Sequence, residues 1–443
     1  MSHTLDSGLG SGIQRVVRSL AANMPDAAAA QKVESRTVVN SVVIRDGVFQ
    51  TADSQNGWVT ETYRKTRARF AARLPNWYRV WLNRIGVSRW PKPLRGMLLP
   101  SDGKLGIFFL PIAVRHVVLR AARALTLSRR RVRFQPGDVL LLPDGYWVMK
   151  RVWPAVAAAR SQGVRVASLV YDLITVEHPG FFTQDSLDKF RRYLEEVDQH
   201  ADLVLTISHT VALDYQKWRA CRPESERGAA PVHVIPLGAD FSDRQSPLRP
   251  QLQDLVDRQI PIFVVVSTIE PRKNHPLVLR AFEQLWSDTN IALVFVGRCG
   301  WMFDSVLEQF QKHPENGHRF WHISDADDGE LNSLLQACAG VICPSHAEGF
   351  GLPIAEGLHH GKPVFASDIA IHREVGGAYC FYFDKTDPSS LTKLIRAHVS
   401  QDKESCSQIS TTSSSMTWKH AAEVVLKELQ TPSEATESRS KQH

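Results

Sequence analysis

From residue 138 onward, short apolar runs alternate with helical stretches, and this alternation limits the possible folds more than any other feature. DVLLLPD (138–144) reads as a buried strand, 152–163 as a helix ended by Gly163, and VRVASLVYD (164–172) as the next strand. Such alternation is typical of a doubly wound parallel sheet in an α/β protein. It continues with a helix over 185–199, a strand over 201–208, another helix and a strand over 231–240.

A polar segment at 241–258, with two prolines, interrupts this pattern and predicts a domain boundary. At 443 residues the chain is too long for one hydrophobic core. We therefore expect two Rossmann-like domains, over 1–245 and 255–415, facing a cleft at the carboxyl ends of their strands. In the second domain we predict strands over 261–268, 291–297, 320–324, 340–345 and 363–367, and helices over 275–286, 303–312, 330–339 and 353–360. An amphipathic helix is predicted over 416–430, followed by a disordered tail over 431–443.

The first domain is predicted to carry a basic insertion over about 50–135. Within it, residues 64–133 hold eighteen arginines and lysines against one acid, Asp102. Interleaved tryptophans and tyrosine suggest a surface that docks on an anionic membrane. A solvated helical insertion whose aromatic residues pack inward is an equally good interpretation. The aromatic residues are Trp77, Tyr78, Trp81 and Trp90.

The net charge and the cysteines restrict the partners and the compartment. A formal net charge of +7 favours polyanionic partners, but the basic residues lie apart from any nucleic-acid-binding module, so nucleic acid is not expected. The six cysteines form no CxxC pair, which argues against zinc sites and for a reducing cytoplasm. Residues 1–15 lack the apolar stretch of a signal peptide. The longest apolar run, 107–114, is far shorter than the roughly 20 residues of a membrane span, so peripheral membrane association is the most that we expect.

The strongest motif is HAEGFGLPIAEGLHHGKP (346–363), directly after a predicted strand. Pro353 suits the first turn of a helix, and Gly361 suits its end. Gly349 and Gly351 leave the preceding turn without side-chain bulk, so its backbone N–H groups could approach a ligand closely. A helix N-terminus after such a turn favours a diphosphate.

Two acids, Glu348 and Glu356, flank this predicted anion site. Carboxylates do not bind phosphate, but they accept hydrogen bonds from vicinal hydroxyls. A diphosphate between two polyols describes a nucleotide sugar. A helix N-terminus with a stabilising acid nearby is the simpler alternative, and it accounts less well for the glycines, the proline and the second acid together.

Two cations in TIEPRKNHP (268–276) are expected to face the same ligand. Arg272 and Lys273 follow a predicted strand and precede a helix, which places them at the edge of the cleft. There they could neutralise a leaving diphosphate. Surface Arg-Lys pairs are common, so this interpretation depends on the presence of Glu348 and Glu356.

Near the start, Gly10 and Gly12 precede a helical pattern in GLGSGIQRVVRSL. They are candidates for a phosphate-facing loop. A strand would be expected before this loop and none is evident, so we expect the chain to begin late in its first βα unit.

Together these motifs resemble the GT-B, family 4 retaining glycosyltransferases, with an E-x7-E motif at Glu348 and Glu356. TIEPRKNHP, VGRCGW, EGFGLPIAEGL, SGIQRVV and VYDLITVEHP look most like bacterial mannosyl- and rhamnosyltransferases of O-antigen, capsule and exopolysaccharide synthesis. The resemblance covers about 10–20 and 138–430.

The resemblance implies a role for each motif. Glu356 would hold the ribose, Glu348 the transferred sugar, and Arg272 with Lys273 the diphosphate. The final helix would return to the first domain. Backbone groups of Gly349, Phe350, Gly351 and Leu352 would contact sugar and phosphate, Gly12 would close over the phosphate, and Ser324 and Asp325 would lie near the base.

One departure from the family concerns the first domain. The family often has a His-Asp pair after an early strand, and here the matching residues are Tyr171 and Asp172, with His178 six residues later. The catalytic residue of this domain is therefore left open between Asp172 and His178.

The resemblance implies transfer of a hexose, with mannose from GDP-mannose as the first choice. The acceptor would be a lipid-linked saccharide or polysaccharide at the inner face of the cytoplasmic membrane. Neither a metal nor another cofactor is expected. A sugar-nucleotide epimerase and a non-catalytic nucleotide-sugar-binding protein are the alternatives.

Overall fold

The computed structural model describes residues 12–24, 42–45, 48–51, 132, 134–143, 145, 152–240, 245–400 and 417–431. The chain divides into two compact units, residues 1–39 with 134–443, and residues 40–133. In the second unit, β1 (Val42–Arg45) and β2 (Val48–Thr51) form an antiparallel pair. The basic and aromatic residues of 64–133 and the tail over 432–443 lie outside the described residues, so what was predicted for them stays a prediction.

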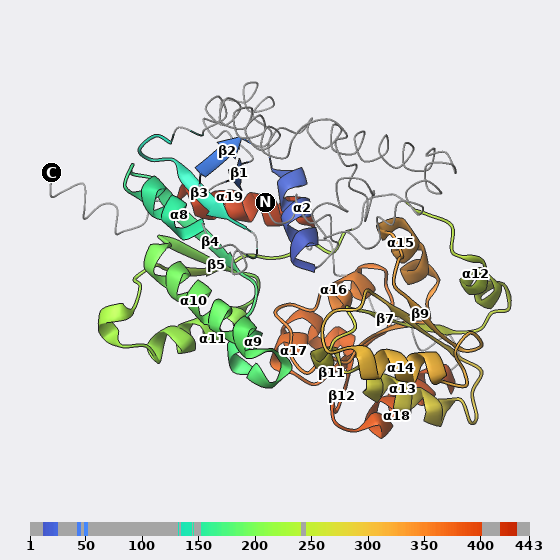
Figure 1. The fold of residues 1–443 in the computed structure, drawn as a ribbon. Coiled ribbons are helices and arrows are strands. Elements are labelled where there is room, and N and C mark those ends of the chain that lie inside the picture. The colour runs from blue at the N-terminus through green and yellow to red at the C-terminus, as the bar shows by residue number, and fades with distance from the viewer. Residues whose placement is uncertain are drawn as a thin grey trace, which may run out of the picture. The chain divides into compact units, whose positions relative to one another are not determined.

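The first unit contains two parallel sheets, each with helical connections (Figure 1). In the smaller sheet the described strands follow the order β3-β4-β5-β6, and every neighbouring pair is parallel. Its strands are β3 (Val139–Leu142), β4 (Arg165–Val170), β5 (Leu203–Thr206) and β6 (Val232–Val234), and its helices are α8 (Val152–Arg160), α9 (Ile174–Glu177), α10 (Gln184–His200) and α11 (His209–Ala220).

The larger sheet has the strand order β12-β11-β10-β7-β8-β9 and is also parallel throughout. The order places β7 and β10 side by side although three helices and two strands separate them in the chain. The strands are β7 (Ile262–Val266), β8 (Ala292–Val296), β9 (Phe320–Ile323), β10 (Gly340–Cys343), β11 (Val364–Ser367) and β12 (Cys380–Phe383). The helices are α12 (Pro250–Asp257), α13 (His275–Leu285), α14 (Asp304–Lys312), α15 (Asp328–Ala337), α16 (Leu352–His359), α17 (Ala370–Gly376) and α18 (Pro388–Ser400).

Both faces of the larger sheet are buried, as a doubly wound sheet requires. Successive residues of β7 point to opposite faces, with Val264 in one apolar core and Phe263 and Val265 in the other. Helices α12, α15, α16 and α17 cover the first face, and α13, α14 and α18 cover the second (Figure 1). This arrangement leaves the loops at the carboxyl ends of the strands as the places where polar side chains collect.

The segment predicted as a domain boundary contains a helix that the sequence reasoning missed. In α12, Leu252 is 0% and Leu255 2% exposed, and both belong to the core of the larger sheet. Residues 241–244 lie outside the described part of the chain. The helix is short and begins with Pro250, so its polar composition concealed its two buried leucines.

The last helix, α19 (Trp418–Gln430), packs against α2 (Gly12–Asn23) and the smaller sheet. Trp418 donates its backbone N–H to Asp240 at 2.7 Å, and His233 of β6 contacts Glu428. Each of the predicted helices and strands from residue 138 onward lies within a few residues of an observed one. Helices α9, α17 and α18 and strand β12 were not predicted from the sequence.

No helix in the described ranges is long and apolar enough to cross a membrane.

We call α2, residues 134–240 and α19 the N-terminal lobe. Residues 245–400 form the C-terminal lobe.

Candidate functional site

Two loops of the C-terminal lobe meet at the carboxyl ends of β7 and β10. The first contains the short 3-10 helix η5 (Pro271–Lys273), and the second leads into α16. The backbone N–H of His346 donates to the carbonyl of Arg272 at 2.8 Å, which ties the loops together. The neighbouring positions of β7 and β10 therefore bring the two predicted motifs into contact.

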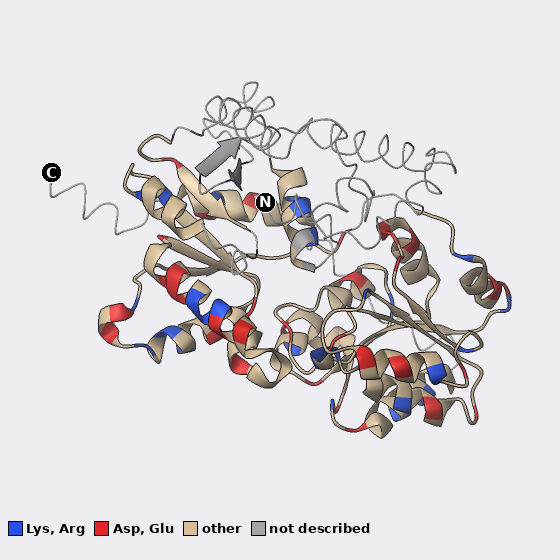
Figure 2. Ribbon diagram, viewed as in Figure 1, with Lys and Arg blue, Asp and Glu red and all other residues tan. Residues whose placement is uncertain are grey.

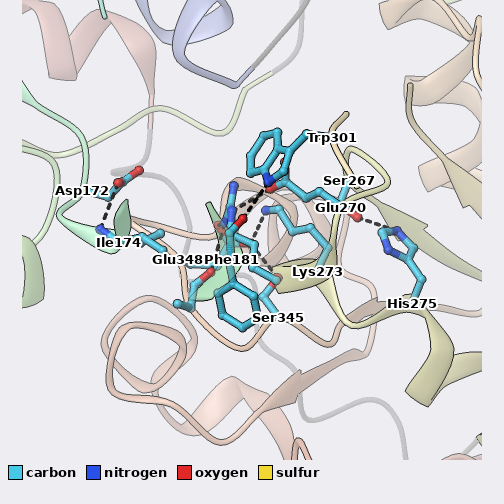
Figure 3. Close-up of polar contacts among 12 residues, drawn as sticks. Asp172, Ile174, Phe181, Ser267, Glu270, Lys273, His275, Trp301, Ser345 and Glu348 are labelled. Atoms are coloured by element: carbon cyan, nitrogen blue, oxygen red, sulfur yellow. Dashed lines mark hydrogen bonds and ion pairs between the residues drawn. The ribbon is translucent and has the colours of Figure 1, made fainter. Parts of the chain in front are cut away.

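Glu348 is the centre of a polar network in these loops (Figure 3). Arg272 donates from Nη1 to Oε2 at 3.0 Å, Ser345 donates from Oγ to Oε1 at 2.7 Å, and Lys273 donates from Nζ to the same Oε1. Burial alone would raise the pKa of Glu348, but Lys273 and Arg272 outweigh it and hold the pKa well below its usual range. Glu348 is therefore an anion whose oxygens are already oriented.

A second carboxylate, Glu270, was missed by the sequence reasoning. It is 3% exposed, and its Oε1 lies 2.6 Å from Nε of Arg272. Burial raises the pKa of Glu270, while Arg272 and Lys273 oppose the rise. The sequence offered one signal for this residue, because Glu270 stands immediately before Pro271 in TIEPRKNHP, beside the two cations. The two cations assigned to a diphosphate thus have acidic partners within the protein itself.

The turn before α16 contains a glycine in a left-handed conformation. Gly351 stands at φ +88°, in the left-handed region that favours glycine, and it precedes the first helical residue, Leu352. Having no side chain, Gly351 cannot cap the helix, and Phe350 beside it packs against the apolar core. The positive end of α16 therefore begins beside Glu348.

This turn also contacts the N-terminal lobe. Ser208, at the start of α11, donates from Oγ to the carbonyl of Gly349 at 2.9 Å. A Cβ at position 349 would lie 2.1 Å from the carbonyl oxygen of Tyr171, at the end of β4. Only glycine allows this approach, so the turn is fitted to both lobes.

We expect Gly349→Ala to destabilise the protein by about 1–3 kcal/mol, because its methyl group would overlap the backbone of Tyr171. The midpoint of thermal unfolding measures the effect. Gly180→Ala is the matched control, since a Cβ there meets no atom within 4 Å. Equal midpoints for both variants would show that the two lobes do not approach as closely as described.

Of the two candidates in the N-terminal lobe, Asp172 is the one whose pKa is influenced by the charges of the Glu348 network. Its Oδ1 accepts a hydrogen bond from the backbone of Ile174 at 3.2 Å. Burial raises the pKa of Asp172, and Arg272 is the strongest opposing influence. His178 is exposed at the end of α9, with its ring centroid 6.1 Å from that of Phe181. Asp172 is thus electrostatically coupled to the network, whereas His178 influences the pKa of His346 in the loop before α16.

Glu356, in α16, contacts the N-terminal lobe through Arg15 of α2. Arg15 Nη1 lies 2.5 Å from Glu356 Oε1, and Glu356 is 2% exposed. Burial raises the pKa of Glu356, Arg15 lowers it, and Asp328 raises it. Gly12 is the first residue of α2, whereas Gly10 lies outside the described residues. Arg15 was not identified from the sequence, where its only signal was its place in SGIQRVV.

Another contact between the lobes involves Glu374 of α17. Its carboxylate accepts hydrogen bonds from the backbone N–H groups of His209 and Thr210 at 2.6 and 2.8 Å, at the N-terminus of α11. Near η3 (Pro179–Phe181), Trp301 donates from its indole to the carbonyl of Phe181 at 2.8 Å. These contacts join the N-terminal lobe to α17 and to the loop that follows β8.

Ser324 and Asp325 lie apart from this network. They are exposed and follow β9, an edge strand separated from β7 by β8. Asp325 accepts a hydrogen bond from Arg249 at 3.2 Å. Within the described ranges, no group of three or more His, Cys, Asp or Glu side chains is placed to hold a metal ion.

Residues 253–415 match the family model described as glycosyl transferases group 1. The chain is 28% identical over 312 residues to a serotype-specific mannosyltransferase, WbdA, of Escherichia coli, covering 67% of this chain and 38% of the relative. It is 26% identical over 245 residues to O-antigen chain mannosyltransferase B of Escherichia coli, covering 54% of this chain and 62% of the relative. The chain thus spans well under half the length of WbdA.

Two solved structures show the fold. The apo structure of OtsA superposes with a TM-score of 0.53 at 13% identity, covering 78% of this chain and 79% of that one. Anabaena HepE, solved with UDP and glucose, gives a TM-score of 0.51 at 17% identity, covering 67% and 78%. The predicted GT-B fold is confirmed.

Proposed function

We propose that this chain is a retaining glycosyltransferase of the family 4 type. It would move a hexose, with mannose from GDP-mannose as the first choice, to a lipid-linked or polysaccharide acceptor during cell-surface polysaccharide synthesis. The observation that carries the proposal is the oriented, ionised Glu348 beside Arg272, Lys273 and the N-terminus of α16. The match to the glycosyl transferases group 1 model and the similarity to O-antigen mannosyltransferases support it.

In the proposed reaction, each part of the site has a separate task. Glu356 accepts hydrogen bonds from the ribose hydroxyls, and Glu348 accepts them from hydroxyls of the transferred sugar. Arg272, Lys273 and the start of α16 stabilise the diphosphate as its bond to the sugar breaks, through an oxocarbenium-like state. The acceptor would enter on the side of Asp172, whose pKa Arg272 lowers.

Membrane association and independence of metal ions also belong to the proposal. The acceptor would be presented at the inner face of the cytoplasmic membrane, with the basic segment 64–133 as the docking surface. The protein should therefore bind vesicles containing anionic lipid more tightly than neutral ones. Because Arg272, Lys273 and the start of α16 would neutralise the diphosphate, we propose that transfer needs no metal ion and runs equally fast in EDTA.

The decisive experiment supplies purified protein with a panel of sugar nucleotides, using membrane extract as the acceptor. Nucleoside diphosphate release that depends on the acceptor, with one sugar nucleotide strongly preferred, is the expected result. A product formed from the sugar nucleotide without any acceptor would instead support an epimerase. Binding of a sugar nucleotide without its consumption would support a non-catalytic binding protein.

We expect Glu356→Ala to raise the KM for the donor on the order of a hundredfold, because two charge-assisted hydrogen bonds to the ribose are lost. Steady-state kinetics with the preferred donor measure the change. The control is Glu423→Ala, at an exposed glutamate of α19. A folded Glu356→Ala enzyme with the wild-type KM would remove Glu356 from the donor site.

A further inference from the structure

The ring of His372, in α17, lies buried beside the glycine turn of the proposed donor site. Its side chain is 0% exposed, and Nε2 has no hydrogen-bond partner among the described residues. A Cβ built on Gly351 would lie 3.4 Å from Cδ2 and 3.7 Å from Nε2 of this ring. Buried polar groups in proteins are nearly always hydrogen-bonded, so this nitrogen calls for an explanation.

The other ring nitrogen of His372 fixes the tautomer. Ser367, the last residue of β11, donates from Oγ to the carbonyl of Ser345 at 2.6 Å, so this Oγ can only accept from His372. Nδ1 lies 3.1 Å from Ser367 Oγ and 3.0 Å from the Ser367 carbonyl oxygen, and both oxygens need a donor. Nδ1 therefore carries the proton, and Nε2 of the neutral ring presents a lone pair.

The charge of the ring decides which ligand groups suit this lone pair. Burial lowers the pKa of His372, Lys273 and Lys385 lower it further, and Glu348 opposes them, so the ring is neutral at physiological pH. A neutral Nε2 repels a phosphate oxygen, because both atoms carry lone pairs. A hydroxyl has a proton to donate, and Glu348, which we propose holds the transferred sugar, is the strongest charge acting on the ring.

Helix α17 also carries the charged residues Arg373 and Glu374 (Figure 2), and both have partners elsewhere. Arg373 donates from Nε to Oδ1 of Asp368 at 2.6 Å, and Glu374 accepts hydrogen bonds at the N-terminus of α11. The charged neighbours of His372 on its own helix are therefore engaged away from Nε2.

His275 offers a comparison, because its Nδ1 is likewise buried without a partner in the described part of the chain. Its ring packs edge-on against Phe295 and Phe310, which belong to an apolar core. No ligand is expected in that core. His372 differs because its ring edge lies beside Gly351, in the turn that we propose contacts the donor.

We propose that His372 accepts a hydrogen bond through Nε2 from a hydroxyl of the transferred sugar, and so helps to select that sugar. This inference deepens the proposed function and rests on it, because it assumes that a sugar nucleotide binds at the start of α16. Gly351 has no side chain, so a hydroxyl can approach the ring edge where a methyl group would otherwise stand. A site that pairs with a hydroxyl strongly rejects a sugar that lacks it.

The test compares the affinities of the purified chain for a sugar nucleotide and for its nucleoside diphosphate by calorimetry. The pairs are GDP-mannose with GDP, UDP-glucose with UDP, and dTDP-rhamnose with dTDP. His372→Phe keeps a ring but has no acceptor. It should bind the preferred sugar nucleotide on the order of tenfold more weakly, and the nucleoside diphosphate as the wild type does. His372→Gln should recover part of the loss, whereas His359→Phe, at an exposed histidine of α16, should bind both like the wild type.

Analogues of the preferred donor that each lack one hydroxyl of the sugar identify the group that His372 contacts. The wild type should bind one of them on the order of tenfold more weakly than the parent compound. His372→Phe should bind that analogue and the parent equally well, because the hydrogen bond is already lost. Losses that add for every analogue would show that His372 contacts none of these hydroxyls, and would overturn the inference.

The remaining results are also distinct. If the wild type binds no member of the three pairs, the proposed function fails and the inference fails with it. If it binds one pair and folded His372→Phe binds that sugar nucleotide equally well, only the inference fails. Equal losses for the sugar nucleotide and its nucleoside diphosphate also contradict it, because they would place His372 at the diphosphate.

A second variant keeps the test decisive if His372→Phe does not fold. Gly351→Ala places a methyl group beside Nε2 and should also weaken binding of the sugar nucleotide more than that of the nucleoside diphosphate. Gly361→Ala is its matched control. Gly361 shares the positive φ, at +63°, but a Cβ there meets no atom within 4 Å. An equal loss for both ligands in Gly351→Ala would contradict the inference.

Discussion

Replacing Glu348 with glutamine is expected to lower kcat/KM on the order of a thousandfold, because it removes both an oriented hydroxyl acceptor and the anion that positions two cations. Arg272 and Lys273 both contact the carboxylate that would be lost. An amide offers them one weaker acceptor and turns an N–H group toward a positive charge. Steady-state kinetics with the preferred sugar nucleotide measure the loss.

Glu348→Gln should also reduce stability by about 3–5 kcal/mol, since it leaves largely buried cations with less compensation. The sign of the pH dependence follows from the lowered pKa of Glu348. Its stabilisation is present above the pKa of an unfolded glutamate, about 4.3, and is lost as the pH falls through the folded value. Unfolding in urea at neutral and at acidic pH should therefore show a smaller difference between wild type and variant at acidic pH.

Two further variants keep this prediction decisive. Glu348→Asp retains the charge but withdraws it by one methylene, so it should fold and still lose most of the activity. Glu308→Gln, at an exposed ion pair of α14, should change neither activity nor stability measurably. Activity close to that of the wild type in a folded Glu348→Gln protein would remove Glu348 from the reaction.

The fold was predictable where local pattern and tertiary environment agree. Strands such as β7 and β8 are continuous apolar runs because both faces of their sheet are covered, and such runs are visible in the sequence. Helix α12 was not predicted from the sequence, because only two of its residues are buried and the rest of the segment is polar. Helix α18 and strand β12, which follow the last motif, were missed as well.

The site was predictable in its components but not in its pairings. The sequence placed Glu348 and the cations Arg272 and Lys273 after different strands, and only the strand order makes β10 a neighbour of β7. For that reason, the sequence reasoning assigned the cations to a ligand and missed their contacts with Glu348. Arg15 and Glu374 were missed because each contacts a partner distant in the chain, whereas Glu270 was missed although its partner Arg272 lies only two residues away.

The charge balance of the site decides whether it attracts a diphosphate. Arg272 and Lys273 face Glu348, Glu270 and Asp172, so the site has an excess negative charge when all three acids are ionised. Burial raises the pKa of Glu270 and Asp172, whereas Glu348 stays ionised. Below the two raised values the excess charge becomes positive. Affinity for a nucleoside diphosphate should therefore fall as the pH rises through them.

Removing one cation tests this balance. Lys273→Met should lower kcat on the order of a hundred- to a thousandfold, because the departing diphosphate loses a preorganised positive charge. Glu348 would still have Arg272 and Ser345 as donors, so the variant should remain folded. Lys217→Met, at a side chain 73% exposed on α11, is the control and should behave like the wild type.

The variant should also alter the pH profile in a definite direction. Lys273 lowers the pKa of Glu270 and Asp172, so its removal lets both values rise further. In Lys273→Met, the fall in diphosphate affinity with rising pH should begin at a higher pH than in the wild type, from a weaker starting affinity. A loss of affinity that is uniform across the pH range would mean that Lys273 acts only as a direct contact. An unchanged kcat would place the departing diphosphate elsewhere.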